Sequence, residues 1–188
     1  MKRLLISIST LVLTFFLFTG CSTFAEGVKE GLEQAKSNDI ESVQTIKSNL
    51  SNISMSFPES WKEASLNDVA TIQMSLEAKE QYMIVIEETS EDFEDEFTVD
   101  DYATIIMENM KTTVEGADVS MINESIIGNN ISARQFELSG SVNKIKAKFL
   151  ITCIEHEDVF YQFTAWSTQS KYEEAKPVFE NILKSINF

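Results

Sequence analysis

Four consecutive segments of this chain are predicted to be strands: residues 119–127, 131–138, 144–154 and 159–166. Apolar residues recur at every second position most regularly from Ile145 to Cys153. A period of two is typical of β-strands, because successive side chains of a strand point to opposite faces of the sheet. The connections at residues 128–130, 139–141 and 155–158 are short, so consecutive strands must run antiparallel. The sequence therefore predicts an antiparallel meander of four strands at the centre of a sheet.

The last two of these segments carry apolar side chains on both faces. In the third segment one face holds Ile145, Ala147, Phe149, Ile151 and Cys153, and the other changes from lysines to Leu150, Thr152 and Ile154. In the fourth segment the two faces hold Phe160, Thr164 and Trp166, and Tyr161, Phe163 and Ala165. A strand that is apolar on both faces requires a covering layer on each side of its sheet.

Two helices are predicted to supply these layers. Thr98 and Asp101 have the spacing of a helix N-cap, and an apolar face follows, so we expect a helix over residues 99–115 that Gly116 stops. Ser170 and Glu173 have capping-box spacing and predict a second helix, with a kink or restart at Pro177.

Three shorter strands are expected before the first helix, at residues 53–57, 69–76 and 82–87. A turn at Pro58 should bring Trp61 back onto the core. The fold class is therefore α+β, with an antiparallel sheet of six or seven strands flanked by helices in an α/β/α sandwich.

The N-terminus has the composition of a secretory signal. Lys2 and Arg3 precede about fifteen mostly apolar residues, a run too short to span a bilayer comfortably. The residues Phe18, Thr19, Gly20 and Cys21 resemble the bacterial lipobox. This resemblance implies removal of residues 1–20 and a diacylglyceryl group on Cys21, and two acyl chains hold a protein stably on a membrane. We expect a lipid-anchored protein on the extracytoplasmic face of the cell membrane; without lipidation it would be secreted in soluble form.

Residues 21–51 are expected to be a tether between the lipid and a domain of residues 52–188. The tether is polar, yet its apolar residues recur at roughly helical spacing, which predicts some helix: Val28, Leu32, Ala35, Ile40, Val43, Ile46 and Leu50.

Charge and cysteine content exclude several classes of protein. With 15 basic and 30 acidic residues the formal net charge is −15, so we expect no nucleic-acid partner. Cys21 and Cys153 are the two cysteines, and acylation of Cys21 would leave no disulfide. The apolar neighbours of Cys153 indicate a buried, inert thiol.

The sequence contains little that indicates catalysis. His156 lies among acidic residues, but it is the single histidine, and a zinc site requires three or four ligands. Neither a Gly-x-Ser-x-Gly elbow nor a Gly-rich phosphate loop occurs. Residues 87–101 carry nine carboxylates in fifteen positions, without the spacing of a calcium loop, which indicates a solvated loop rather than a cation site. We expect neither an enzyme nor a cofactor or metal.

Two groups of residues are candidates for binding. Lys144, Lys146 and Lys148 form a basic stripe that could contact an acidic partner, or could simply solvate one strand end. Met107, Met110 and Trp166 could line a small-ligand pocket between sheet and helix, although methionines at helical spacing are more often core residues.

Several short motifs resemble those of DcrB-type and PsbP-like lipoproteins, over about residues 53–188. These are Phe57, Pro58 and Trp61, the acidic lead to Thr98, the pair Ile127 and Gly128, the pair Tyr161 and Gln162, and residues 182–186. The resemblance implies an α/β/α sandwich that acts through protein contacts and brings no catalytic residues. The leading hypothesis is therefore a protein-binding or scaffold module with a partner in the envelope, and the alternative is a small-ligand-binding lipoprotein.

Overall fold

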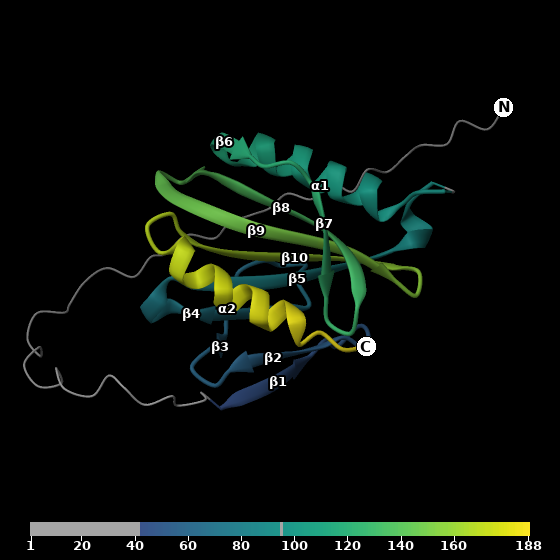
Figure 1. The fold of residues 1–188 in the computed structure, drawn as a ribbon, viewed down its shortest axis with the longest axis horizontal. Helices are drawn as coiled ribbons and strands as arrows, with labels where there is room; N and C mark the ends of the chain where they lie inside the picture. Colours follow the sequence, from purple (N-terminus) through teal and green to yellow (C-terminus); the bar gives the residue numbers. More distant parts are fainter. Residues whose placement is uncertain (1–41, 95) are drawn as a thin grey trace, which may run out of the picture.

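The computed structural model describes residues 42–94 and 96–188 (Figure 1). The proposed signal, Cys21 and most of the tether lie outside the described residues. In chain order the elements are β1 (Val43–Lys47), β2 (Ser54–Pro58), β3 (Lys62–Glu63), β4 (Ile72–Leu76), η1 (Glu77–Lys79), β5 (Gln81–Thr89), η2 (Ser90–Asp92), α1 (Val99–Thr113), β6 (Glu115–Val119), β7 (Asn123–Ile127), β8 (Ile131–Val142), β9 (Ile145–His156), β10 (Val159–Thr168) and α2 (Tyr172–Lys184).

The main sheet is antiparallel, with the strand order β3-β4-β5-β10-β9-β8-β6, and β7 also pairs with β8. The long strands β8, β9 and β10 form its centre, as the alternation predicts. This confirms the α+β fold class, but the sheet has eight strands rather than six or seven. β1 and β2 form a separate two-stranded sheet (Figure 1).

Both faces of the main sheet are covered. Tyr161, Phe163 and Ala165 of β10 pack with α2 and β2 on one side, and Phe160 and Trp166 pack with α1 on the other. The predicted faces of β9 are confirmed as well, except that Ile145 near the hairpin tip is 45% exposed. Figure 1 shows the two helices on opposite sides of the sheet.

The helical spacing of residues 43–50 is misleading. Val43, Thr45 and Lys47 are exposed while Gln44 and Ile46 are half-buried, which is the period of an edge strand. Each residue of β1 pairs with one of β2, and the Gln44 side-chain amide donates a hydrogen bond to the carbonyl oxygen of Trp61 at 2.6 Å. The prediction of helix is therefore wrong for residues 43–47, because a non-local strand partner overrides the local spacing.

Two predicted boundaries in the meander are also wrong. The expected turn at residues 139–141 is continuous strand, and β8 turns at Asn143 and Lys144, whose φ angles are +52° and +70°. Of the expected strand at 119–127, residues 123–127 form β7, which pairs with the first half of β8. The strand β6 lies earlier, at Glu115–Val119, and pairs with the second half of β8.

The helix predictions differ in outcome at their N-termini. Thr98 and Asp101 form a capping box at α1, which ends at Thr113, two residues before the predicted end. Helix α2 begins at Tyr172 after Lys171 with no side-chain cap, so the predicted capping role of Ser170 is wrong. Pro177 lies within one continuous helix, in which no restart occurs.

Candidate functional site

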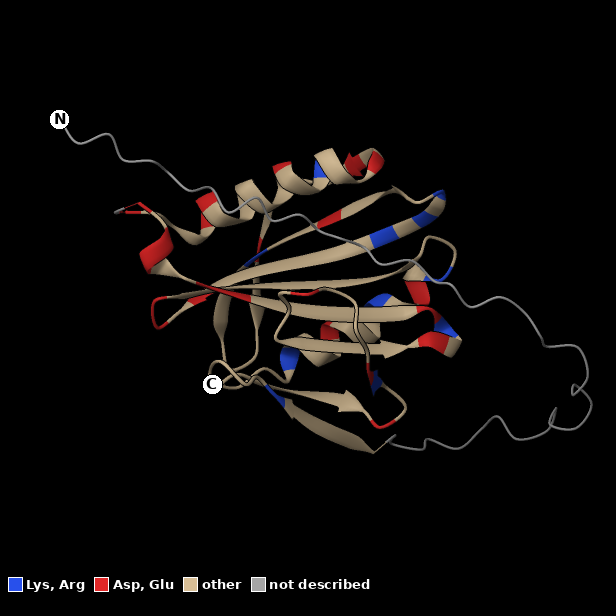
Figure 2. Ribbon diagram, turned by 180° about the vertical axis from the view of Figure 1, so that it is seen from behind, with Lys and Arg blue, Asp and Glu red and all other residues tan. Residues whose placement is uncertain are grey.

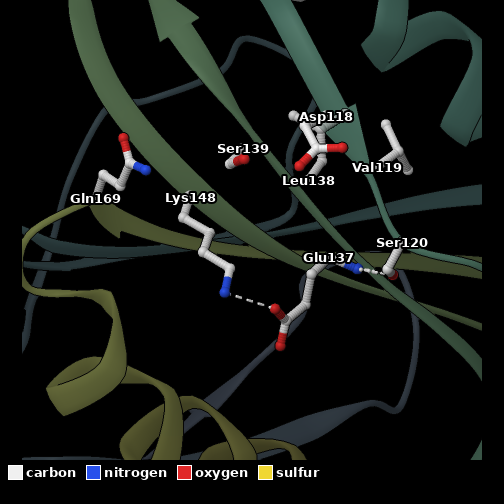
Figure 3. Close-up of a pocket in the computed structure, with 8 residues that line it drawn as sticks. All are labelled: Asp118, Val119, Ser120, Glu137, Leu138, Ser139, Lys148 and Gln169. Carbon is white, nitrogen blue, oxygen red and sulfur yellow. Dashed lines mark hydrogen bonds and ion pairs between the residues drawn. The ribbon is translucent and has the colours of Figure 1, made fainter.

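A pocket of about 320 Å³ opens on the face of the sheet that α2 covers, next to the start of this helix (Figure 3). Its walls come from the end of β6, the middle of β8, β9 and the segment after β10: Asp118, Val119, Ser120, Glu137, Leu138, Ser139, Lys148 and Gln169. Asp118 is the cross-strand neighbour of Ser139, and Ser139 that of Lys148. The small side chain of Ser139 therefore lies between the longer side chains of Asp118 and Lys148, and this difference in size leaves the pocket over Ser139.

Ion pairs tie one end of this pocket to helix α2. Lys148 Nζ lies 2.8 Å from Glu137 Oε2 and 3.3 Å from Glu173 Oε1, and 4.4 Å from the centre of the Tyr172 ring. Lys176 Nζ lies 2.6 Å from the other oxygen of Glu137. These ion pairs form one network, which Lys176 extends to Glu180 at 3.9 Å, and they fix the side chains of Glu137 and Lys148.

The titration of this network follows from its contacts. Burial alone would raise the pKa of Glu137, but hydrogen bonds from Lys148 and Lys176 outweigh it and lower that pKa. Burial would lower the pKa of Lys148, but its hydrogen bonds to Glu137 and Glu173 raise it. Both groups are therefore held in their charged forms near neutral pH, where neither is poised to exchange protons.

Replacing Glu137 with glutamine is expected to lower the free energy of unfolding at pH 7 by about 1–2 kcal/mol, since two partly buried charged hydrogen bonds are weakened. A carboxyl whose pKa is lowered by folding stabilises the fold above its unfolded pKa, and this stabilisation disappears as pH falls through the folded value. The deficit of the Glu137→Gln variant should thus shrink below about pH 4.5, the ordinary value. Urea unfolding across pH measures it.

Glu173→Gln is the matched control, because the Glu173 side chain is 81% exposed and contacts Lys148 alone in the network. Its effect should be well below that of Glu137→Gln at pH 7. If the difference in free energy of unfolding between Glu137→Gln and the wild type stayed constant as pH fell well below 4.5, the loss would come from altered packing rather than from the missing charge.

The predicted basic stripe is divided by this network. Lys148 is engaged, whereas Lys144 lies in the β8–β9 turn and Lys146 is exposed beside it. Neither Lys144 nor Lys146 makes an ion pair within residues 42–94 and 96–188. In Figure 2 the blue bands at this end of β9 contrast with red segments around the start of α1.

The proposed ligand-binding residues lie on the other side of the sheet. Met110 on α1 and Trp166 on β10 are buried between the helix and the sheet, and the ring of Trp166 stacks on Tyr82 with centroids 5.3 Å apart. Met107 is partly buried against the same cluster. These three residues are packed as core, and the pocket described above contains none of them.

The remaining titratable candidates have structural surroundings. His156 ends β9 and its ring stacks on Phe188, with centroids 4.0 Å apart. Cys153 is buried, as predicted, and burial raises its pKa. No group of three or more histidines, cysteines or acids that could hold a metal occurs among the described residues.

Carboxylates of the acidic segment 87–101 also have identifiable partners. Glu88 accepts a hydrogen bond from the Tyr102 hydroxyl at 2.6 Å, and Asp101 caps α1. Asp100 accepts two hydrogen bonds from the Arg134 guanidinium, which lowers the pKa of that carboxyl. This segment thereby fastens the start of α1 to β5 and β8.

A second surface feature is the outer edge of β7. One edge of β7 pairs with residues 131–135 of β8, and its other edge has no strand partner in the part of the chain that the structure describes. Two large apolar side chains lie on or beside this strand: Ile126 is 69% exposed and Met121 is 80% exposed. Sequence reasoning missed both the pocket and this edge, because each depends on the pairing of β6 and β7 with different halves of β8.

Comparisons with known proteins identify the fold. No family model matches the chain, and no curated protein matches it in sequence. The solution structure of the cyanobacterial PsbP protein CyanoP from Synechocystis is similar with a TM-score of 0.59 and 12% identity, over 83% of this chain and 98% of that one. The structure of LpqN from Mycobacterium tuberculosis has a TM-score of 0.54 and 12% identity, over 78% and 90% of the two chains.

A third similar structure is that of Mog1p from Saccharomyces cerevisiae, with a TM-score of 0.51 and 8% identity, over 78% of this chain and 95% of that one. At these identities the likeness establishes a PsbP-like fold and does not establish function. Among the helices of residues 42–94 and 96–188, none has the length and apolar character to cross a membrane.

Proposed function

We propose that this chain is a lipid-anchored protein of the extracytoplasmic membrane face whose sandwich domain is a non-enzymatic protein-binding module. The observation that supports the binding role most is the outer edge of β7, with Ile126 and Met121 exposed at 69% and 80%. An unpaired strand edge offers a row of N–H and C=O groups to which an extended segment of another protein can add as a strand.

The side chains of β7 suit such an addition. Ile126 is exposed on one face of the strand, while Ile127 is buried in the α2-side core and anchors the strand. A partner strand would gain main-chain hydrogen bonds from β7 and an apolar contact with Ile126. The partner we propose is a protein of the cell envelope.

Two of the proteins with similar structures have roles that agree with this proposal. Mog1p is a Ran-binding protein, and LpqN is involved in cell envelope biogenesis. By analogy of fold, we extend a binding role in the envelope to this chain. The fixed charges of Glu137 and Lys148 also favour binding over proton-transfer chemistry at the pocket.

Site-specific photocrosslinking tests the binding role. A photoreactive amino acid at Ile126, in the full chain expressed in its own host, should give a reproducible adduct with one envelope protein. Val69 is the control position, because it is 57% exposed and lies in the connection before β4, at the far edge of the sheet. An Ile126 adduct pattern no different from that of Val69 would contradict the proposal.

The lipid anchor has its own test. The wild-type chain should incorporate labelled palmitate and lose residues 1–20, and the intact mass of the mature protein should show both changes. Cys21→Ser should incorporate no label and should not be cut before residue 21, whereas Cys153→Ala should behave as the wild type. Cleavage before residue 21 in the Cys21→Ser variant, or a wild-type chain without lipid, would rule out the anchor.

A further inference from the structure

The pocket beside helix α2 has an unbalanced charge at one end. Glu137 and Lys148, which line the pocket, are paired with each other, and Glu173, Lys176 and Glu180 continue this ion-pair network away from the pocket. Asp118, at the opposite wall, makes no ion pair with any residue of the described ranges. Among the residues that line the pocket, two acids and one lysine are charged, so the lining has an excess of one negative charge, and Asp118 is the acid that has no ion pair with a described residue.

Two further polar side chains at the pocket have unused hydrogen-bonding capacity. The Ser139 hydroxyl and the Gln169 side-chain amide line the hollow, and neither makes a hydrogen bond with another described residue. The lysine does not compensate Asp118, because Figure 3 shows the Lys148 side chain directed towards Glu137. The open groups are thus the exposed Asp118 carboxylate, the Ser139 hydroxyl and the exposed Gln169 amide, whose oxygens can accept hydrogen bonds around one negative charge.

These acceptors are spread over the pocket rather than gathered at a point. Asp118 lies on β6, Ser139 on β8, and Gln169 follows β10. An ammonium group is a compact point charge, whereas a guanidinium presents five N–H donors in a planar fork that can contact several separated acceptors. The donor group that fits this arrangement is a guanidinium.

We infer that the pocket between β6, β8 and β9 binds an arginine side chain of the protein partner. The inference rests on the proposed binding role and specifies one contact of it. The pocket adjoins the β7 edge along the chain, because Asp118 and Ser120 line the pocket and Met121 follows directly. A partner segment added along β7 could therefore place an arginine in the pocket.

The test uses the mature chain from residue 21 onward, with Cys21→Ser for solubility, and follows its backbone amides by NMR. The probe is N-acetyl-arginine amide, with N-acetyl-citrulline amide as an uncharged analogue of the same shape and N-acetyl-lysine amide as the ammonium analogue. We expect saturable shifts centred on Asp118, Ser139 and Gln169 with the arginine compound, at a Kd no tighter than about millimolar, because one solvated ion pair contributes little affinity by itself. The citrulline and lysine compounds should bind at least about fivefold more weakly.

Variants locate the contact. Asp118→Asn should weaken binding of the arginine compound about fivefold, and the exposed Asp68→Asn elsewhere on the acidic surface should leave it unchanged. Equal binding of the citrulline compound, equal or tighter binding of the lysine compound, or shifts centred on residues 87–101 would each overturn the inference. If the wild-type chain bound no arginine compound in the NMR titration but still gave the Ile126 photocrosslink, the pocket contact alone would be rejected. If it bound the arginine compound but gave no Ile126 photocrosslink, the proposed function would be rejected.

Discussion

Replacing Trp61 with alanine is expected to lower the free energy of unfolding by about 3–5 kcal/mol, a large part of the stability of a single domain. The indole is fully buried in the α2-side core. Its ring lies 5.6 Å from that of Phe57 on β2 and 6.3 Å from that of Phe179 on α2, between centroids. Removal of the indole would leave a cavity between helix and small sheet. Urea unfolding followed by circular dichroism measures the loss.

Trp61→Phe separates the packing contribution from the polar one. The buried indole N–H makes no hydrogen bond with a described residue, so phenylalanine removes an unsatisfied donor while it keeps an aromatic ring. We expect Trp61→Phe to cost about 1–2 kcal/mol, well below the alanine variant. A loss below about 1.5 kcal/mol for Trp61→Ala would mean that the β1–β2 sheet collapses onto α2 and fills the space.

The burial of Trp61 was predictable because its signal is local. The turn that begins at Pro58 returns the chain within three residues, and the Trp61 N–H donates to the Pro58 carbonyl oxygen at 3.0 Å. The capping of α1 by Thr98 and Asp101 is equally local. The two apolar faces of β10 were predictable as well, because side-chain alternation alone assigns residues to faces.

Strand pairing depends on distant partners, and here prediction from the sequence was incomplete. The strand at Val43–Lys47 exists because β2 offers it an edge, and residues 43, 46 and 50 alone indicate a helix. The division of residues 115–127 between two halves of β8 likewise depends on register. A lone sequence does not contain the register of strands that are far apart in the chain.

The pocket could not have been assembled from the sequence for the same reason. Asp118, Ser139 and Lys148 become neighbours through two cross-strand pairings, each of which depends on the register of β8. The lysine stripe was visible from its alternation, yet the partners that engage Lys148 come from β8 and α2. The binding groups of this surface thus arise from tertiary structure rather than from a motif.

Replacing Gly140 with alanine is the second change for which we expect a large loss of stability. Gly140 does not form a turn; it lets β8 lie close to the chain at Val114 and Glu115. The residue lies within β8, and a Cβ there would overlap with Val114 Cγ1 and would be 2.9 Å from the carbonyl oxygen of Glu115. Gly140→Ala should therefore push the junction of α1 and β6 away from β8 and lower the free energy of unfolding by about 2–3 kcal/mol. Thermal and urea unfolding of the variant measure this loss.

Two further variants show which contact causes the loss at Gly140. Val114→Ala removes the flexible part of the clash, so Gly140→Ala should cost less in that background, while the backbone oxygen of Glu115 keeps the rescue partial. Gly116→Ala is the opposite case: a Cβ would meet nothing within 4 Å, but φ is +66°. Its cost should be about 1 kcal/mol, from backbone strain alone. If Gly140→Ala cost no more than Gly116→Ala, β6 would not be held against β8 at this point, and the wall of the pocket that carries Asp118 would be free to move.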